Sequence, residues 1–149
     1  MFSRVAVEGK AKAMYLLIVD DIATSRKLLR VTLEAEGHNT LEAADGVEAL
    51  QMLARETVDA VISDILMPNM DGFRLCHEIR ESERFHALPF IIYTSIYTSA
   101  GDVKLAQTVG ADKYLTKPAP IADVLKALRE VMETQTVRPV EPAAPAIPI

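Results

Sequence analysis

The chain has 149 residues, of which 50% are hydrophobic, and a formal net charge of −5. This length and composition predict one globular domain with a full core, flanked by short ends. The mildly acidic balance argues against a large nucleic-acid surface, so we expect no direct contact with nucleic acid, while contact through a partner domain stays open. A single cysteine excludes an intrachain disulfide, and nothing indicates an oxidising compartment.

The two ends differ in character from the middle. Residues 1–13 are mixed in composition and are expected to be an N-terminal arm, a leader or a fusion remnant. Residues 136–149 carry prolines at 139, 142, 145 and 148. This spacing suits polyproline II, so we predict a linker or a disordered tail, with a ligand for a proline-binding domain as the alternative. A linker there would make the chain one module of a longer protein, with the domain itself at 14–135.

No segment indicates a membrane or an export route. The apolar runs are far shorter than a membrane span, and the first residues lack the sustained apolar stretch of a signal peptide. We therefore expect a cytoplasmic protein that does not contact membranes.

Between the ends, short apolar runs alternate with helix-length segments. The predicted strands and helices, in chain order, are 15–19, 23–37, 38–44, 46–56, 58–63, 72–82, 88–95, 102–110, 111–117 and 121–134. Gly37 and Gly110 are expected to end their helices. In the segment 46–56, Val47, Leu50 and Ala54 are predicted to form the buried face.

Five strand–helix units of this kind predict an α/β fold, with a parallel sheet covered by helices on both faces. The carboxyl ends of parallel strands meet at one edge of the sheet, where ligands bind in such folds. Polar residues follow four of the five predicted strands: Asp20 and Asp21, Asp64, Thr94 and Ser95, and Lys117.

These side chains have a coherent chemistry if they meet. Two like charges about 4 Å apart repel by roughly 4 kcal/mol at an effective dielectric of 20, so three carboxylates need a cation, and all-oxygen ligation suits Mg²⁺. Lys117 and Thr94 suit the oxygens of a phosphoryl group, and no glycine-rich nucleotide loop is present. Such a carboxylate can attack phosphorus and form an acyl phosphate. Each residue alone also fits a cap or a turn, but four strand ends together argue against that interpretation.

Four stretches carry a family resemblance: "LLIVDD", "VISDILMPNMDGF", "FIIYTS" and "GADKYLTKP". Over about residues 15–134 the chain resembles the receiver domains of response regulators in two-component phosphorelays, including those of hybrid or multi-sensor kinases. The resemblance implies a flavodoxin-like (βα)5 three-layer sandwich with strand order 2-1-3-4-5.

The resemblance also implies a role for each site residue. Asp64 is the expected phosphoacceptor, and Asp20, Asp21, Asp64 and the backbone carbonyl of Leu66 are the expected ligands of Mg²⁺ or Mn²⁺. Thr94 and Lys117 would bind the phosphoryl group, and Thr94 and Tyr114 would form the switch. The Lys117–Pro118 peptide bond is expected to be cis.

The implied function is signalling rather than enzymatic turnover. A histidine kinase or phosphotransfer protein would donate a phosphoryl group from phosphohistidine. The surface formed by the fourth helix, fifth strand and fifth helix would then change, and a homodimer through this surface is expected.

Two rival functions stay open. A Mg²⁺-dependent aspartyl phosphatase or phosphomutase would need a second acid two residues after the nucleophile, where this chain has Leu66. A phosphorylation-independent interaction module is the other rival, which the full set of site residues disfavours.

The resemblance has departures. The stretch from Thr94 to Gly110 is one residue longer than is usual in the family, which predicts a longer loop before the fourth helix, with an unusual Tyr97 as a packing residue or a partner contact. Leu66 and Ile96 cannot orient a hydrolytic water, so we expect a long-lived acyl phosphate.

The remaining chemistry-bearing side chains have simpler interpretations. Cys76 is expected in the core. His38, His77 and His86 show no spacing typical of metal ligands.

Overall fold

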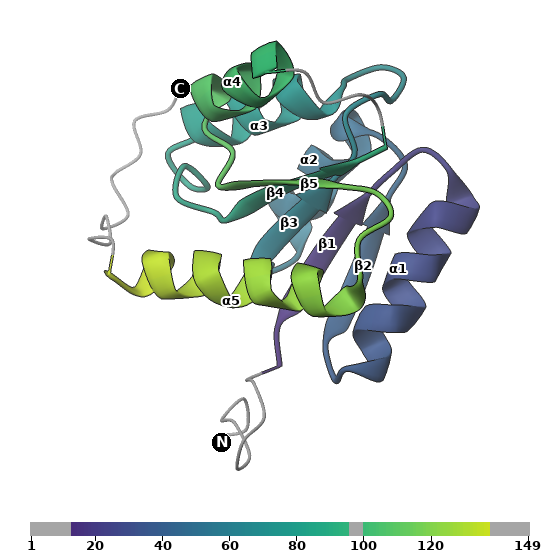
Figure 1. The fold of residues 1–149 in the computed structure, drawn as a ribbon. Coiled ribbons are helices and arrows are strands. Elements are labelled where there is room, and N and C mark those ends of the chain that lie inside the picture. The colour runs from purple at the N-terminus through teal and green to yellow at the C-terminus, as the bar shows by residue number, and fades with distance from the viewer. Residues whose placement is uncertain (1–12, 96–99, 138–149) are drawn as a thin grey trace.

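A computed structural model describes residues 13–95 and 100–137 of the chain. Strands and helices alternate through the whole of this part (Figure 1). They are β1 (Tyr15–Val19), α1 (Ala23–Ala35), β2 (Asn39–Ala43), α2 (Gly46–Arg55), β3 (Ala60–Ser63), α3 (Gly72–Glu81), β4 (Phe90–Thr94), α4 (Ala100–Val109), β5 (Lys113–Thr116) and α5 (Ile121–Val137). The five predicted strand–helix units are confirmed.

The strands form one parallel sheet in the order β2-β1-β3-β4-β5, as expected. The register brings the strand ends level in pairs, since Val19 pairs with Ser63 and Thr94 pairs with Thr116. Ser63 pairs with Ile92, so β4 and β5 extend about two residues further toward the carboxyl edge than β1 and β3. The residues that follow these strands therefore emerge side by side at the carboxyl edge. Gly37 and Gly110 have φ values of +94° and +99°, which explains why glycine ends α1 and α4.

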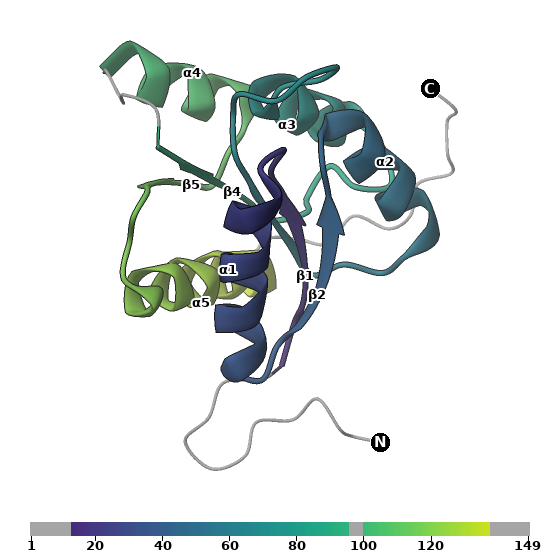
Figure 2. The ribbon, with the colours of Figure 1, turned by 90° about the vertical axis from the view of Figure 1, so that its right-hand side faces the viewer.

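Helices cover both faces of the sheet, and each face has its own core (Figure 2). Helices α2, α3 and α4 pack on one face, which we call the α3 face, and α1 and α5 pack on the other, the α5 face. Successive residues of β4 alternate between the two cores, because strand side chains point to opposite faces in turn. Phe90 and Ile92 join the α3 face, whereas Ile91 and Tyr93 join the α5 face.

The predicted buried face of α2 is wrong at two of its three positions, whereas Leu50 is partly buried and packs against the core of the α3 face. Val47 is 40% exposed and Ala54 is also exposed, while Ala49 and Leu53 are buried together with Gly46. The physical reason lies at the start of the helix, where a Cβ at position 46 would stand 2.7 Å from the Met70 side chain. Close packing at this point turns Gly46 inward, on the same face as Ala49 and Leu53, and leaves Val47 at the surface.

Several expectations fall outside the described residues or at their limit. Helix α5 continues to Val137, past the predicted domain boundary at 135. The expected arm up to residue 12, the proline-rich segment from 138 onward, and Ile96 and Tyr97 of the longer loop lie outside the described part. Within the described part, no helix combines the length and apolar character that crossing a membrane requires.

Candidate functional site

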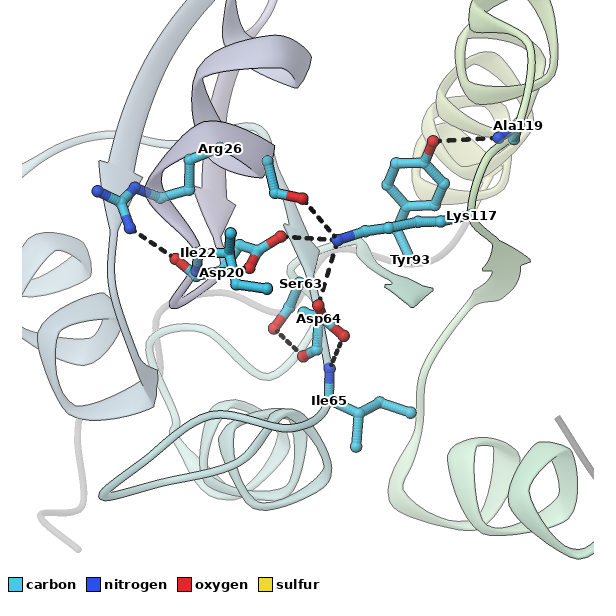
Figure 3. A network of polar contacts seen from close by, with 10 residues as sticks. Asp20, Ile22, Arg26, Ser63, Asp64, Ile65, Tyr93, Lys117 and Ala119 are labelled. Carbon is cyan, nitrogen blue, oxygen red and sulfur yellow. Dashed lines mark hydrogen bonds and ion pairs between the residues drawn. The ribbon is translucent and has the colours of Figure 1, made fainter. Parts of the chain in front are cut away.

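Lys117 lies between two buried carboxylates at the carboxyl edge of the sheet (Figure 3). Its Nζ donates to Asp20 Oδ2 at 2.7 Å and to Asp64 Oδ2 at 3.2 Å. A third, longer contact of 3.4 Å reaches Ser25 Oγ at the start of α1. Asp20 and Asp64 are only 4% and 8% exposed. The structure thus brings together residues from three different strand ends.

The backbone around Asp20 fixes this carboxylate. Its N–H donates to the Ala43 carbonyl at the end of β2, at 3.1 Å. Its Oδ1 accepts from the Ile22 N–H at 2.9 Å, and its carbonyl accepts from Arg26 Nη1 at 2.7 Å. One carboxylate oxygen is therefore held locally, and the other remains for the cation.

Asp64 is held in the same manner, one strand along the sheet. Its N–H donates to the Val19 carbonyl at 2.9 Å, and its Oδ1 accepts from the Ile65 N–H at 2.7 Å. Gly72, the first residue of α3, lies against its backbone. A Cβ at position 72 would stand 2.1 Å from the Asp64 carbonyl oxygen, so only glycine lets α3 begin here. The "DG" of the motif is thereby explained, because Asp71 caps α3 by accepting from the Arg74 N–H.

The loop between β3 and α3 carries Leu66, whose side chain is 62% exposed. This loop is tied to the start of α2. Asn69, with a φ of +67°, donates from Nδ2 to Asp45 Oδ2 at 2.7 Å, and the Gly46 N–H donates to the Met70 carbonyl at 3.1 Å. The segment bearing the predicted carbonyl ligand is therefore anchored at its far end.

Thr94 and Lys117 are linked through the backbone. Thr94 is fully buried at the end of β4, and its carbonyl accepts from the Lys117 N–H at 2.8 Å. The Lys117–Pro118 bond is cis, as the resemblance implied.

Tyr93 is a site residue that the sequence analysis missed. Its hydroxyl accepts from the Ala119 N–H at 3.2 Å, and its ring centroid lies 5.6 Å from Lys117 Nζ. Figure 3 marks the hydrogen bond to Ala119 with a dashed line and shows the Tyr93 ring beside the Lys117 side chain. Strand alternation alone places Tyr93 and Thr94 on opposite faces, but it does not show that the ring meets Lys117. Ser25 was missed for a similar reason, since it lies on a helix rather than at a strand end.

The electrostatics of the trio favour a charged lysine. Burial by itself lowers the pKa of Lys117, but hydrogen bonds and the charges of Asp20 and Asp64 outweigh it, so the pKa is raised overall. One ammonium nevertheless faces two carboxylates, which leaves a net negative charge at the site.

Two other predicted site residues, Asp21 and Tyr114, lie outside the contacts of Lys117 with Asp20 and Asp64. Asp21 is exposed. Tyr114 lies on the α3 face, and its buried hydroxyl has no hydrogen-bond partner among the described residues. Burial, followed by the charges of Asp102 and Asp64, raises the pKa of this phenol.

The side chains at the site, as they lie in the structure, provide only part of the ligand set that a hard divalent cation needs. Among the described residues, no three acidic, histidine or cysteine side chains gather closely enough to hold a metal by themselves. Lys117 instead supplies the positive charge between Asp20 and Asp64. The all-oxygen chemistry and the residual negative charge are nevertheless what Mg²⁺ prefers.

A cavity of about 230 Å³ opens beside the trio, between α1 and α5. Asp20, Asp64 and Lys117 line one part of it, and apolar side chains that include Leu28 and Ile121 line the rest. The cavity therefore lies on the α5 face of the sheet, beside the site.

Cys76 is a core residue, as expected. It is completely buried, and its thiol donates to the Val109 carbonyl with a sulfur–oxygen distance of 3.5 Å. Burial raises its pKa to about 11, which makes the thiol unreactive at neutral pH.

Comparisons with known proteins agree with this geometry. The model of the response regulator receiver domain family matches residues 16–129. A 14.6 kDa protein of Leptolyngbya boryana is 38% identical over 117 residues, which make up 78% of this chain and 88% of the relative. Response regulator MprA of Mycobacterium leprae is 35% identical over 119 residues, or 80% of this chain and 51% of the relative. The chain thus spans about half the length of MprA.

Two solved structures extend the comparison to three dimensions. The receiver domain of a signal transduction histidine kinase from Syntrophus aciditrophicus has a TM-score of 0.78 at 30% identity, covering 91% of this chain and 100% of that one. The receiver domain of sensor histidine kinase PA1611 from Pseudomonas aeruginosa, with magnesium in its active site cleft, has a TM-score of 0.74 at 26% identity, covering 81% of this chain and 98% of that one. Sequence and fold agree that the chain belongs to the response regulator receiver domain family.

Proposed function

We propose that Asp64 accepts a phosphoryl group from the phosphohistidine of a histidine kinase or phosphotransfer protein. The observation that carries this proposal is the position of Asp64. Its carboxylate is buried at the carboxyl edge of the sheet, next to Asp20 and within 3.2 Å of the Lys117 ammonium. A buried carboxylate in contact with a cation, beside a cavity, is suited to nucleophilic attack on a small phosphorylated group.

The transfer is a displacement at phosphorus. A carboxylate oxygen of Asp64 forms the new P–O bond while the P–N bond to the donor's imidazole breaks. The electron pair stays on the imidazole nitrogen, and Asp64 becomes an acyl phosphate. Lys117 shifts its hydrogen bond from the Asp64 carboxylate to a phosphoryl oxygen, and the Thr94 hydroxyl donates to another.

We assign Asp20, Asp21, Asp64 and the Leu66 carbonyl as the residues that would hold Mg²⁺ or Mn²⁺. The magnesium in the PA1611 receiver domain supports this assignment. When bound, the cation would offset the negative charge that the carboxylates and the phosphoryl group bring together.

The same proposal includes a switch on the α3 face. The buried hydroxyl of Tyr114 has no partner among the described residues, which disfavours its present position by about 1–3 kcal/mol. Helix α4 has one buried residue, Ala106, in its described length, so few contacts hold it. Movement of Thr94 toward the phosphoryl group would let Tyr114 and α4 repack together.

A homodimer through α4, β5 and α5 is the proposed result of that repacking. Leu105 on α4 is 43% exposed and offers an apolar contact. Light scattering before and after phosphorylation tests this part, and an unchanged monomer mass contradicts it.

We also propose that the acyl phosphate is long-lived. Leu66 presents an exposed apolar side chain near Asp64 and has no group to orient an attacking water. The decay of phosphorylated protein, followed by intact mass, is expected to take many minutes. A lifetime of seconds contradicts this expectation.

The decisive test uses acetyl phosphate with Mg²⁺ as a small phosphodonor. Intact mass spectrometry should show the addition of one phosphoryl group to the wild-type chain and none to Asp64→Asn. Asp123→Asn, which removes an exposed carboxylate of α5, is the matched control and should be phosphorylated normally. A wild-type chain that gains no Asp64-dependent phosphoryl group would support the interaction-module alternative. Continuous release of phosphate at high turnover would support a phosphatase.

A further inference from the structure

Tyr93 has two separate contacts with the segment that carries Lys117. It lies one residue before the end of β4 and packs in the core of the α5 face, where it also lines the cavity beside the site. Its hydroxyl accepts from the Ala119 N–H at 3.2 Å, which ties the backbone two residues beyond the lysine. Its ring lies 5.6 Å from the ammonium at the other end of the lysine side chain.

The lysine needs such restraint because its side chain is long. Four methylene groups carry the ammonium, and holding them in one arrangement costs rotamer entropy. The three hydrogen-bond contacts to Asp20, Asp64 and Ser25 hold it now, at 2.7, 3.2 and 3.4 Å. When a phosphoryl group is added to Asp64, the contact with that carboxylate must be exchanged for a new one.

A ring face at this distance attracts a cation without forming a directional bond. It can therefore stay in contact while the ammonium changes its hydrogen-bond partner. A leucine or isoleucine in the same place would fill the same core but would offer no such attraction.

We propose that Tyr93 is a positioning residue for Lys117 in phosphoryl transfer. The ring keeps the ammonium close to Asp64 while the ammonium changes its hydrogen-bond partner. The hydroxyl, through its bond to Ala119, holds the backbone just after the lysine. This inference rests on the proposed phosphoacceptor function, and it concerns a residue outside the set of strand-end groups that receive the phosphoryl group.

The test distinguishes three contributions of Tyr93 to phosphoryl uptake: the aromatic ring, the hydroxyl and apolar packing. Tyr93→Phe keeps the ring and loses the acceptor, whereas Tyr93→Leu loses both and keeps an apolar side chain. Uptake from acetyl phosphate with Mg²⁺ is measured for each, alone and combined with Lys117→Ala. Tyr15→Leu is the control, because Tyr15 lies at the start of β1, at the opposite edge of the sheet.

Tyr93→Leu is expected to slow uptake about 3- to 10-fold, which is the size of a partly desolvated cation–π contact. Tyr93→Phe should slow it less than about 3-fold, and Tyr15→Leu should leave it unchanged. In the Lys117→Ala background, Tyr93→Leu should have no further effect, since both changes then remove the same contribution. An equal slowing with and without Lys117, or no slowing by Tyr93→Leu in the wild-type background, overturns the proposal.

A second readout does not depend on phosphorylation. The order parameter of the Lys117 ε-methylene, from carbon relaxation in selectively labelled protein, should fall in Tyr93→Leu and stay near the wild-type value in Tyr93→Phe. An unchanged order parameter in Tyr93→Leu overturns the positioning role. If the wild-type chain takes up no phosphoryl group while the order parameter falls as expected, the phosphoacceptor function fails and the positioning of Lys117 stands.

Discussion

Tyr93 and Tyr114 lie on neighbouring strands but on opposite faces of the sheet. Tyr93 pairs with Leu115 and Tyr114 with Ile92 in the β4–β5 register, so the two side chains point away from each other. The hydroxyl of Tyr93 is held by the Ala119 N–H, whereas that of Tyr114 is buried without a partner among the described residues. Tyr93 therefore contacts the segment that carries Lys117, whereas the Tyr114 hydroxyl makes no hydrogen bond to any described residue.

This difference divides the site into two halves. On the α5 face, Tyr93 holds the group that would meet the phosphoryl oxygens. On the α3 face, Tyr114 packs on the side of the sheet where α4 has the single buried residue Ala106, compared with four buried residues in α3. The function proposed above needs both properties, because phosphoryl transfer requires fixed charges and the proposed switch requires an element that can repack. The predictions below test this division.

The largest effect is expected from Gly72→Ala, because both halves depend on where Asp64 lies. The new Cβ would stand 2.1 Å from the Asp64 carbonyl oxygen, so the start of α3 must shift. We expect a loss of about 3 kcal/mol or more in the free energy of unfolding, measured by urea denaturation. Gly37→Ala is the control. It meets nothing within 4 Å but has a φ of +94°, so it should lose about 1 kcal/mol through backbone strain alone. Equal losses in the two variants would contradict the packing argument.

The next effect is expected from Lys117→Ala, which removes the cation from the fixed half. Asp20 and Asp64 would be left facing each other, and the free energy of unfolding should fall by about 2 kcal/mol without Mg²⁺. Added Mg²⁺ should restore much of the loss, because a divalent cation can replace the ammonium. Lys113→Ala provides the comparison, since its pair with Glu130 is 37% and 41% exposed and should matter by less than about 1 kcal/mol. A loss that Mg²⁺ leaves unchanged would count against a metal site.

The same substitution in the two tyrosines should have opposite signs. Tyr93→Phe loses a hydrogen bond and leaves the Ala119 N–H without that acceptor, so stability should fall by about 1 kcal/mol. Tyr114→Phe removes a buried hydroxyl that has no hydrogen-bond partner among the described residues, so stability should rise by up to about 1 kcal/mol. Thermal or denaturant unfolding measures both, and a change of the same sign in both variants breaks the comparison.

The smallest effect concerns the far edge of the sheet and provides a reference away from both halves. His38 is buried, and its Nδ1 accepts from the Met14 N–H at 3.1 Å. Burial lowers the pKa of His38, with the charge of Glu36 opposing this in part. The unfolded chain therefore binds the proton first as the pH falls below about 6.5, and stability should decrease there. His38→Gln should flatten this part of the stability profile, while phosphoryl uptake at neutral pH stays at the wild-type level. A profile that keeps its slope below this pH would assign the titration to another group.

Much of the fold and part of the site could be predicted because they depend on local pattern. Short apolar strands alternating with amphipathic helices require a parallel sheet with two covered faces, and parallel strands bring their carboxyl ends to one edge. Asp20, Asp64, Thr94 and Lys117 were identified from that argument alone. The prediction for α2 failed because the buried side of that helix is set by the approach of Met70 to Gly46, which is a contact between distant segments.

By itself, the sequence determined which residues reach the carboxyl edge, since a strand end is a local property. Only the tertiary structure decided how they meet. Lys117 lies 97 positions after Asp20 and still donates to it at 2.7 Å, and this contact depends on the sheet order and on side-chain rotamers. The contacts of Tyr93 on which its proposed role rests also depend on the tertiary structure. Strand alternation assigns it a face, but its contact with the lysine exists only because β4 and the segment after β5 are packed side by side.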